Sequence, residues 1–179
     1  PAFAEIKKEA VSYKSTGANM EGYVAFDTKS AKKKPAIRIV HDWMGLGDYT
    51  KGKAEKLAGM GYVAFAVDVY GKGIRPQNAQ EAGALATKYK KDIPELRSRI
   101  RAAYDTVAAM PNVDTKKIIV IGYCFGGTTA LELARSGAPL AGTAVFHAGL
   151  ATPNAADAKN IKSPILVMHG ADDPYVPAA

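Results

Sequence analysis

The chain has 179 residues, of which 47% are hydrophobic and 23% charged, a length and composition typical of one soluble globular domain. No apolar run approaches the ~20 residues that span a bilayer, so the sequence predicts no membrane segment. The single cysteine excludes an internal disulfide. The net charge of +7 comes from scattered lysine runs, and no zinc-ligand spacing or RNA-binding signature accompanies them. We therefore predict no nucleic-acid partner, and attribute the charge to solubility or to anionic substrates.

The N-terminus bears on localisation. The chain begins at Pro1, and Ala2-Phe3-Ala4 resembles the small-x-small end of a secretory signal. This pattern favours a periplasmic over a cytoplasmic location; the alternative is an arbitrary start of the chain.

Strand-like and helix-like segments alternate along the first half of the sequence. Residues 11–14 and 22–26 alternate in hydrophobicity and predict an antiparallel hairpin. Residues 36–40 form a short β-branched run, and 62–67 form a continuous apolar run typical of a strand buried on both faces. Between them, 53–60 is expected to be helical.

The alternation continues to the C-terminus. The expected helices are 77–89, one that begins at Asp92 and stops at Met110, and 126–135; the expected strands are 117–121, 140–146 and 165–168. Apolar strands alternating with helices predict a single α/β domain over residues 1–179, with a mostly parallel sheet and helices on both faces. Ligands of such sheets bind beyond the carboxyl ends of the strands.

The motif IGYCFGG at residues 121–127 lies at such a strand end. Strand, Gly-x-nucleophile-x-Gly and helix form a nucleophile elbow, in which small flanking residues permit the strained turn that exposes Cys124. Two alternatives exist. A lone cysteine is often inert core packing, and glycines after a strand can hold a phosphate. The segment lacks the Gly-Lys-Ser/Thr and G-x-G-x-x-G patterns of phosphate loops, so the elbow is favoured.

Four segments carry a family resemblance: HDWMGLGDY, GYVAFAVDVYGKG, GYCFGG and HGADDPYVP. In this order they resemble the dienelactone hydrolase family of α/β-hydrolases. The resemblance implies an α/β-hydrolase fold with Cys124 as the nucleophile and Asp173 as the acid of a catalytic triad, Asp172 being the alternative. It also implies that Asp42 contacts the resting thiol. The expected oxyanion hole consists of the backbone N–H groups of Trp43 and Phe125.

The base of the triad is the part that this sequence does not supply in the expected place. The family has its histidine a few tens of residues after the acid, whereas His41, His147 and His169 all precede Asp173. We predict structural or pocket-lining roles for these three. The last strand and helix, and the catalytic histidine, are expected to lie outside the sequence shown.

These features predict hydrolysis of a small carboxylic ester or lactone through a cysteine acyl-enzyme, with no metal or organic cofactor. Tyr70, Arg75 and Tyr123 are candidate pocket residues, and Arg75 or Lys72 is a candidate binder of a substrate carboxylate. The alternative is a homologue that binds a ligand without catalysis, or one whose exposed thiol senses oxidation. The sequence does not indicate an oligomeric state.

Overall fold

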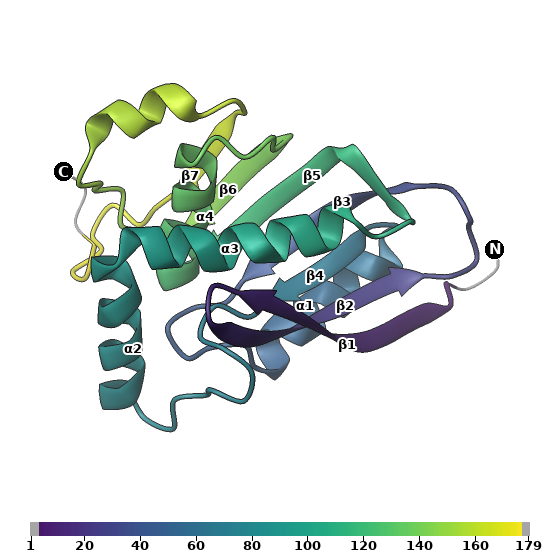
Figure 1. Ribbon diagram of the computed structural model, residues 1–179, viewed down its shortest axis with the longest axis horizontal. Coiled ribbons are helices and arrows are strands. Elements are labelled where there is room, and N and C mark those ends of the chain that lie inside the picture. The colour runs from purple at the N-terminus through teal and green to yellow at the C-terminus, as the bar shows by residue number, and fades with distance from the viewer. Residues whose placement is uncertain (1–3, 177–179) are drawn as a thin grey trace.

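The computed structural model describes residues 4–176, which form seven strands and five helices (Figure 1). The strands are β1 (Ile6–Ser15), β2 (Ala18–Asp27), β3 (Lys34–Val40), β4 (Val63–Val67), β5 (Val113–Tyr123), β6 (Gly142–Phe146) and β7 (Ile165–Met168). The helices are α1 (Asp48–Gly59), α2 (Ala79–Lys91), α3 (Ile93–Ala108), α4 (Phe125–Arg135) and the 3-10 helix η1 (Ala155–Asn160). The Ala2-Phe3-Ala4 segment falls largely outside the described residues.

All seven strands join one sheet in the order β1-β2-β4-β3-β5-β6-β7. The β1–β2 and β2–β4 pairs are antiparallel, and the other four pairs are parallel. The two-residue turn between β1 and β2 contains Gly17 at φ 68°, a conformation that glycine adopts without steric cost. The prediction of a mostly parallel α/β sheet is confirmed.

Helices cover both faces of the sheet, as predicted. In Figure 1, α3 crosses in front of the sheet and α1 lies behind it, against β2, β4 and β3. Helix α4 packs beside α3, against β5 and β6. Every residue of β4 is buried because this strand lies between two covered faces, which explains its continuous apolar sequence.

Helix α3 forms where the sequence predicts it. The Asp92 side chain accepts a hydrogen bond from the Glu95 N–H (3.1 Å), and Pro94 occupies the first turn. Its apolar face is buried. Arg97 on α3 bonds Glu132 (2.8 Å) and Asp157 (2.6 Å) and joins α3 to α4 and η1. These partners lie far away in the sequence, so the periodicity of α3 does not reveal the contacts.

Several element boundaries differ from the prediction. The β1–β2 ladder pairs ten residues of each strand, well beyond 11–14 and 22–26, because backbone pairing continues where the hydrophobic alternation stops. Helix α1 starts at Asp48 instead of residue 53, and α2 is displaced by two residues. Gly142 instead of residue 140 begins β6. The order and type of the elements are unaffected.

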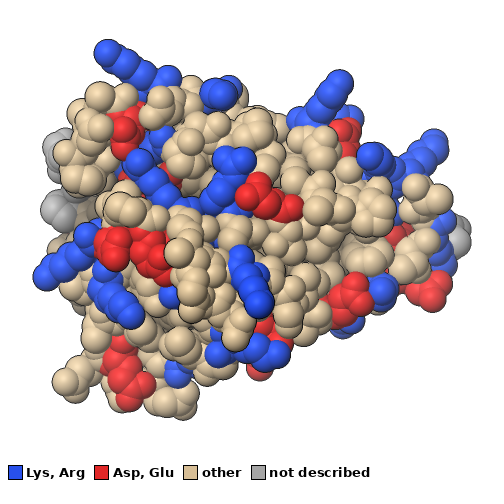
Figure 2. All heavy atoms as spheres, viewed as in Figure 1, with Lys and Arg blue, Asp and Glu red and all other residues tan. Residues whose placement is uncertain are grey.

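The surface agrees with the scattered charge of the sequence. On the face seen in Figure 2, Lys and Arg side chains are interspersed with Asp and Glu. Within residues 4–176, no helix has the length and apolarity to cross a membrane. The absence of a nucleic-acid partner stays a prediction.

Candidate active site

Cys124 lies at the sharp turn between β5 and α4. Its backbone has φ 54° and ψ −116°, a strained combination for a residue with a side chain. Two backbone hydrogen bonds hold the turn. Cys124 N–H donates to the Phe146 carbonyl (2.9 Å), and Gly127 N–H donates to the Cys124 carbonyl (2.9 Å). This geometry is that of a nucleophile elbow, which the sequence motif predicts.

The glycines of the motif are required by close backbone contacts. A Cβ atom on Gly122 would lie 2.1 Å from the Gly126 carbonyl oxygen. A Cβ atom on Gly127 would lie 2.7 Å from the Cβ of Ala148. The elbow therefore leaves no room for a side chain at either glycine, and this tight packing fixes the position of the thiol.

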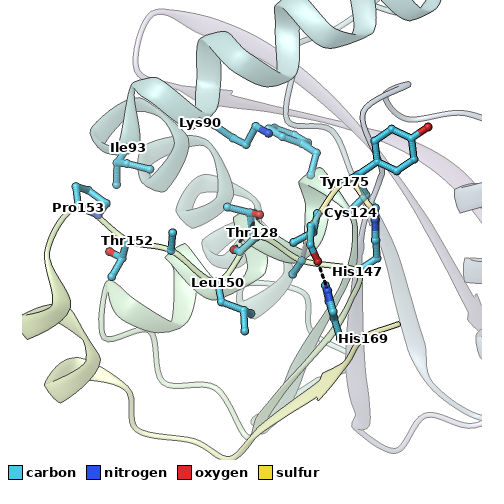
Figure 3. A pocket seen from close by; sticks show the side chains of 15 residues that line it. Lys90, Ile93, Cys124, Thr128, His147, Leu150, Thr152, Pro153, His169 and Tyr175 are labelled. Carbon is cyan, nitrogen blue, oxygen red and sulfur yellow. Dashed lines mark hydrogen bonds between the residues drawn. The ribbon is translucent and has the colours of Figure 1, made fainter. Parts of the chain in front are cut away.

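The thiol opens onto a cavity of about 890 Å³ at the carboxyl edge of the sheet. The lining residues are Lys90, Ile93, Cys124, Phe125, Thr128, His147, Ala148, Gly149, Leu150, Ala151, Thr152, Pro153, His169, Tyr175 and Val176. In Figure 3, Ile93 and Pro153 lie across the cavity from Cys124 and His147. Most of the wall is apolar, which is typical of a small-molecule site.

A carboxylate and an imidazole meet on the same side as the thiol. Asp173 Oδ2 lies 2.6 Å from His147 Nε2, and Asp173 Oδ1 accepts hydrogen bonds from the N–H groups of Tyr175 (2.9 Å) and Val176 (3.0 Å). Burial opposes ionisation, but these hydrogen bonds outweigh it and lower the pKa of Asp173. Asp172, the alternative acid, is exposed and points to no such partner among the described residues.

His147 has an unusual backbone conformation for its residue type. Its φ is 56°, and among non-glycine residues of the described chain only Cys124 shares this region. It follows β6 directly, so its ring enters the cavity that Cys124 lines. Strained residues concentrate at functional sites, and here the two of them lie on one cavity.

The other two histidines are placed differently. His169 stacks on His147 with ring centroids 6.2 Å apart, and its Nε2 bonds the Val176 carbonyl. His41 is buried beneath the site. The prediction of structural or pocket-lining positions fits these two side chains, whereas His147 is both pocket-lining and bonded to Asp173.

The electrostatic environment keeps the thiol protonated. Burial raises the pKa of Cys124, and the charges of Asp42 and Asp173 raise it further. The Phe125 N–H and the ammonium group of Lys90 act in the opposite direction without reversing the shift. A thiol in this state needs a base to become a nucleophile.

Asp42 and Trp43 lie in the loop after β3. The Asp42 side chain accepts a hydrogen bond from Met44 N–H (2.8 Å), so Asp42 shapes this loop. Its influence on Cys124 is through charge. Phe125 is the first residue of α4, where backbone N–H groups have no partner within the helix.

The three predicted pocket residues lie outside the lining of this cavity. Tyr70 is fully buried and donates its hydroxyl hydrogen to the Trp43 carbonyl (2.9 Å). Arg75 bonds the Leu46 carbonyl (2.6 Å) and lies near Asp68, so its guanidinium group is occupied structurally. Tyr123 stacks on Phe146. The placements of Tyr70, Arg75 and Tyr123 in the substrate pocket are therefore corrected.

The residues that do form the far wall come from segments without a motif. Lys90 and Ile93 lie at the junction of α2 and α3, and Leu150, Thr152 and Pro153 lie in the segment after β6. The position of this segment beyond a parallel strand is the one sequence signal that indicates it.

Comparisons with known proteins agree with the α/β-hydrolase fold. A family model described as "Dienelactone hydrolase family" matches residues 20–179. A protein of Aquifex aeolicus named "Putative carboxymethylenebutenolidase" is 30% identical over 172 residues, which cover 94% of this chain and 73% of that protein. A solved structure named m3DLH has a TM-score of 0.91 at 37% identity, covering 97% of this chain and 72% of that chain. The crystal structure of a dienelactone hydrolase-like promiscuous phosphotriesterase from metagenomic libraries has a TM-score of 0.90 at 37% identity, covering 96% and 71%.

Proposed function

The chain belongs to the dienelactone hydrolase family and is a hydrolase, and from this membership we propose that it cleaves small carboxylic esters or lactones through a cysteine acyl-enzyme. One observation carries the proposal. Cys124, in its strained elbow, shares a cavity with His147, whose imidazole is paired with Asp173. Nucleophile, imidazole and carboxylate are the three parts of a catalytic triad.

In the first half-reaction, the Cys124 sulfur attacks the carbonyl carbon while its proton moves to the imidazole paired with Asp173. Among the described residues this imidazole is His147, for which the sequence predicts only a structural or pocket-lining role, with the base expected outside the sequence shown. The oxyanion accepts hydrogen bonds from the backbone N–H groups of Trp43 and Phe125. When the tetrahedral intermediate collapses, the imidazolium gives its proton to the departing alkoxide, and a thioester on Cys124 remains.

In the second half-reaction, water attacks the thioester carbonyl and its proton moves to the imidazole. The second tetrahedral intermediate expels the Cys124 sulfur, which recovers the proton, and the carboxylic acid leaves. The lowered pKa of Asp173 keeps this residue ionised, so that it stabilises the imidazolium at each stage. Each proton that the imidazole accepts is returned within the same half-reaction.

The cavity favours esters with an apolar part. Ile93, Leu150 and Pro153 provide an apolar wall, while Lys90 contributes a cation at the junction of α2 and α3. We expect Lys90 to favour substrates that also carry a carboxylate, the role that the sequence assigned to Arg75 or Lys72.

Hydrolysis of p-nitrophenyl acetate tests this proposal. We expect a burst of one equivalent of p-nitrophenol, an acetylated protein in the mass spectrum and slower steady turnover. Cys124→Ala should abolish all three, and His147→Gln should reduce the burst rate by about a hundredfold or more, in the range of general-base contributions. Acetylation without turnover would favour a ligand-binding homologue. Full activity of His147→Gln would assign the base to another residue.

A second activity is supported by one comparison, the promiscuous phosphotriesterase that is 37% identical to this chain. Attack of the Cys124 sulfur at a phosphorus centre would use the same cavity, since the N–H groups that bind a carbonyl oxygen also bind a phosphoryl oxygen. Diethyl p-nitrophenyl phosphate is the probe, and Cys124→Ala is the control. Release of p-nitrophenol that survives this substitution would exclude the shared site.

A further inference from the structure

The loop that carries Trp43 is held from below by two buried side chains that line no part of the cavity. His41 is 1% exposed and Tyr70 is 0% exposed. The two side chains form hydrogen bonds with the peptide units before and after Trp43. His41 bonds the Asp42 carbonyl, and Tyr70 bonds the carbonyl of Trp43 itself. We call these two residues the Trp43 clamp.

His41 controls the peptide unit that contains the Trp43 N–H. Val69 N–H donates to His41 Nε2 (3.2 Å), so the ring is an acceptor there and a donor at Nδ1. Nδ1 donates to the Asp42 carbonyl oxygen at 2.6 Å. In a trans peptide the C=O and N–H bonds point in opposite directions, so this contact turns the Trp43 N–H away from His41.

Tyr70 fixes the next peptide unit. Its hydroxyl donates to the Trp43 carbonyl at 2.9 Å, and its ring lies 4.8 Å from that of His41 and 5.2 Å from that of Phe125. Its own carbonyl accepts from Arg99 Nη1 at 2.7 Å. The clamp is therefore anchored in the core and also contacts Phe125, the residue with the second expected oxyanion N–H.

We propose that His41 and Tyr70 are positioning residues that aim the Trp43 N–H at the reacting carbonyl oxygen. The inference rests on the proposed cysteine hydrolase function. A chain of hydrogen bonds from Val69 through His41 to the Asp42 carbonyl also polarises the Trp43 N–H, which strengthens it as a donor. Neither side chain touches substrate in this role.

Tyr70→Phe tests the clamp with little change in shape. Loss of one oxyanion donor costs about a hundred- to a thousandfold in rate. A donor that remains but is less firmly oriented should cost less, so we expect kcat for p-nitrophenyl acetate to fall about tenfold with KM within twofold of the wild type. Tyr104→Phe is the matched control, because Tyr104 is also a buried tyrosine that donates to a backbone carbonyl, that of Pro139 (3.4 Å), and has no contact with the clamp.

Alkylation of Cys124 by iodoacetamide distinguishes a misplaced Trp43 N–H from a general loss of thiol reactivity. This displacement at carbon needs the thiolate but forms no oxyanion. We expect Tyr70→Phe to alkylate within twofold of the wild-type rate while its acetylation is slowed. Equal losses in both reactions, or no loss in either, would overturn the proposal.

His41 provides an independent pair of variants. Asparagine retains an N–H donor near the position of Nδ1, whereas phenylalanine removes it. We expect His41→Asn to retain more acetylation activity than His41→Phe at equal alkylation rates, and the reverse order would contradict the clamp. If Cys124→Ala still hydrolyses the ester, the proposed function fails, a result distinct from failure of the clamp.

Discussion

Gly126 and His41 are in such close contact that a Cβ atom on Gly126 would stand 2.3 Å from the His41 carbonyl oxygen. The first turn of α4 thus lies directly against the end of β3. Because both partners are backbone, neither can move aside, and the contact joins the thiol turn to the loop of the Trp43 clamp.

Gly126→Ala should therefore destabilise the fold strongly. Forcing a methyl group into a filled space costs about 1–3 kcal/mol, and a clash with backbone should reach the upper end of that range. Gly52→Ala in α1 is the control, since nothing lies within 4 Å of its added Cβ. There we expect a gain of about 0.5–1 kcal/mol. Urea unfolding of both variants measures the difference, and equal midpoints would contradict it.

The stability of the fold also depends on a buried charge, that of Glu132, and on its ion-pair partners. It is fully buried and pairs with Arg97 (2.7 Å) and Arg135 (2.7 Å). Glu132→Gln leaves Arg135 without an anion and Arg97 with Asp157 alone, so we expect a loss of about 3 kcal/mol in the free energy of unfolding. Asp105→Asn breaks the exposed pair with Arg101 and should cost less than about 1 kcal/mol. Similar losses would indicate that the Glu132 network contributes little.

The side chain of Arg38, in the central strand β3, has no hydrogen-bonding partner in the described part of the chain. Its three guanidinium nitrogens are buried and unpaired within residues 4–176, and its main contact is the Tyr104 ring, 4.5 Å from Cζ. Burial lowers the pKa of Arg38 to about 9. We expect Arg38→Met to raise the free energy of unfolding by about 1–4 kcal/mol, since an apolar side chain avoids this desolvation.

Arg101→Met is the matched control for this prediction. Arg101 also lies over the Tyr104 ring, at 5.3 Å, but its side chain is 46% exposed. Its loss should change the unfolding midpoint little. A loss of stability in Arg38→Met would instead reveal a partner for the buried guanidinium group, such as an internal water.

The pH dependence of thiol alkylation tests the electrostatics of the site. The pKa of Cys124 is raised, so the rate should climb with pH to a midpoint above that of a free cysteine. Asp42 raises this pKa and Lys90 lowers it. Asp42→Asn should therefore shift the midpoint to lower pH and Lys90→Met to higher pH. Shifts in the same direction would contradict the assignment.

The parts of the site that follow strict backbone rules were predictable from the sequence. Gly122 and Gly126 predict the elbow because no larger residue fits its backbone contacts. The residue between them in the motif, Cys124, is therefore predicted as the nucleophile. The family resemblance of the segment HGADDPYVP, and no backbone rule, led to the prediction of Asp173 as the acid. Its pairing with His147 depends on how the neighbouring strands β6 and β7 bring their ends together, and no local pattern encodes that distance.

Side-chain direction was the part that sequence reasoning could not reach. Tyr70 and Arg75 both follow β4 and both have groups suited to substrate binding, yet each turns into the protein to satisfy backbone carbonyls. Tyr123 ends β5, one residue before the nucleophile, and strand alternation places it on the opposite face. Knowing that a residue lies at the correct edge does not reveal which way it points.

The ladder of the parallel strands β5, β6 and β7 connects the reactive groups. Cys124 follows β5, His147 follows β6 and Asp173 follows β7, so the three residues lie at the ends of neighbouring strands. Backbone pairing between these strands thus sets the spacing of side chains that are far apart in the sequence. A substitution that disturbs either ladder should lower the rate of acetylation even where no side chain of the site has changed.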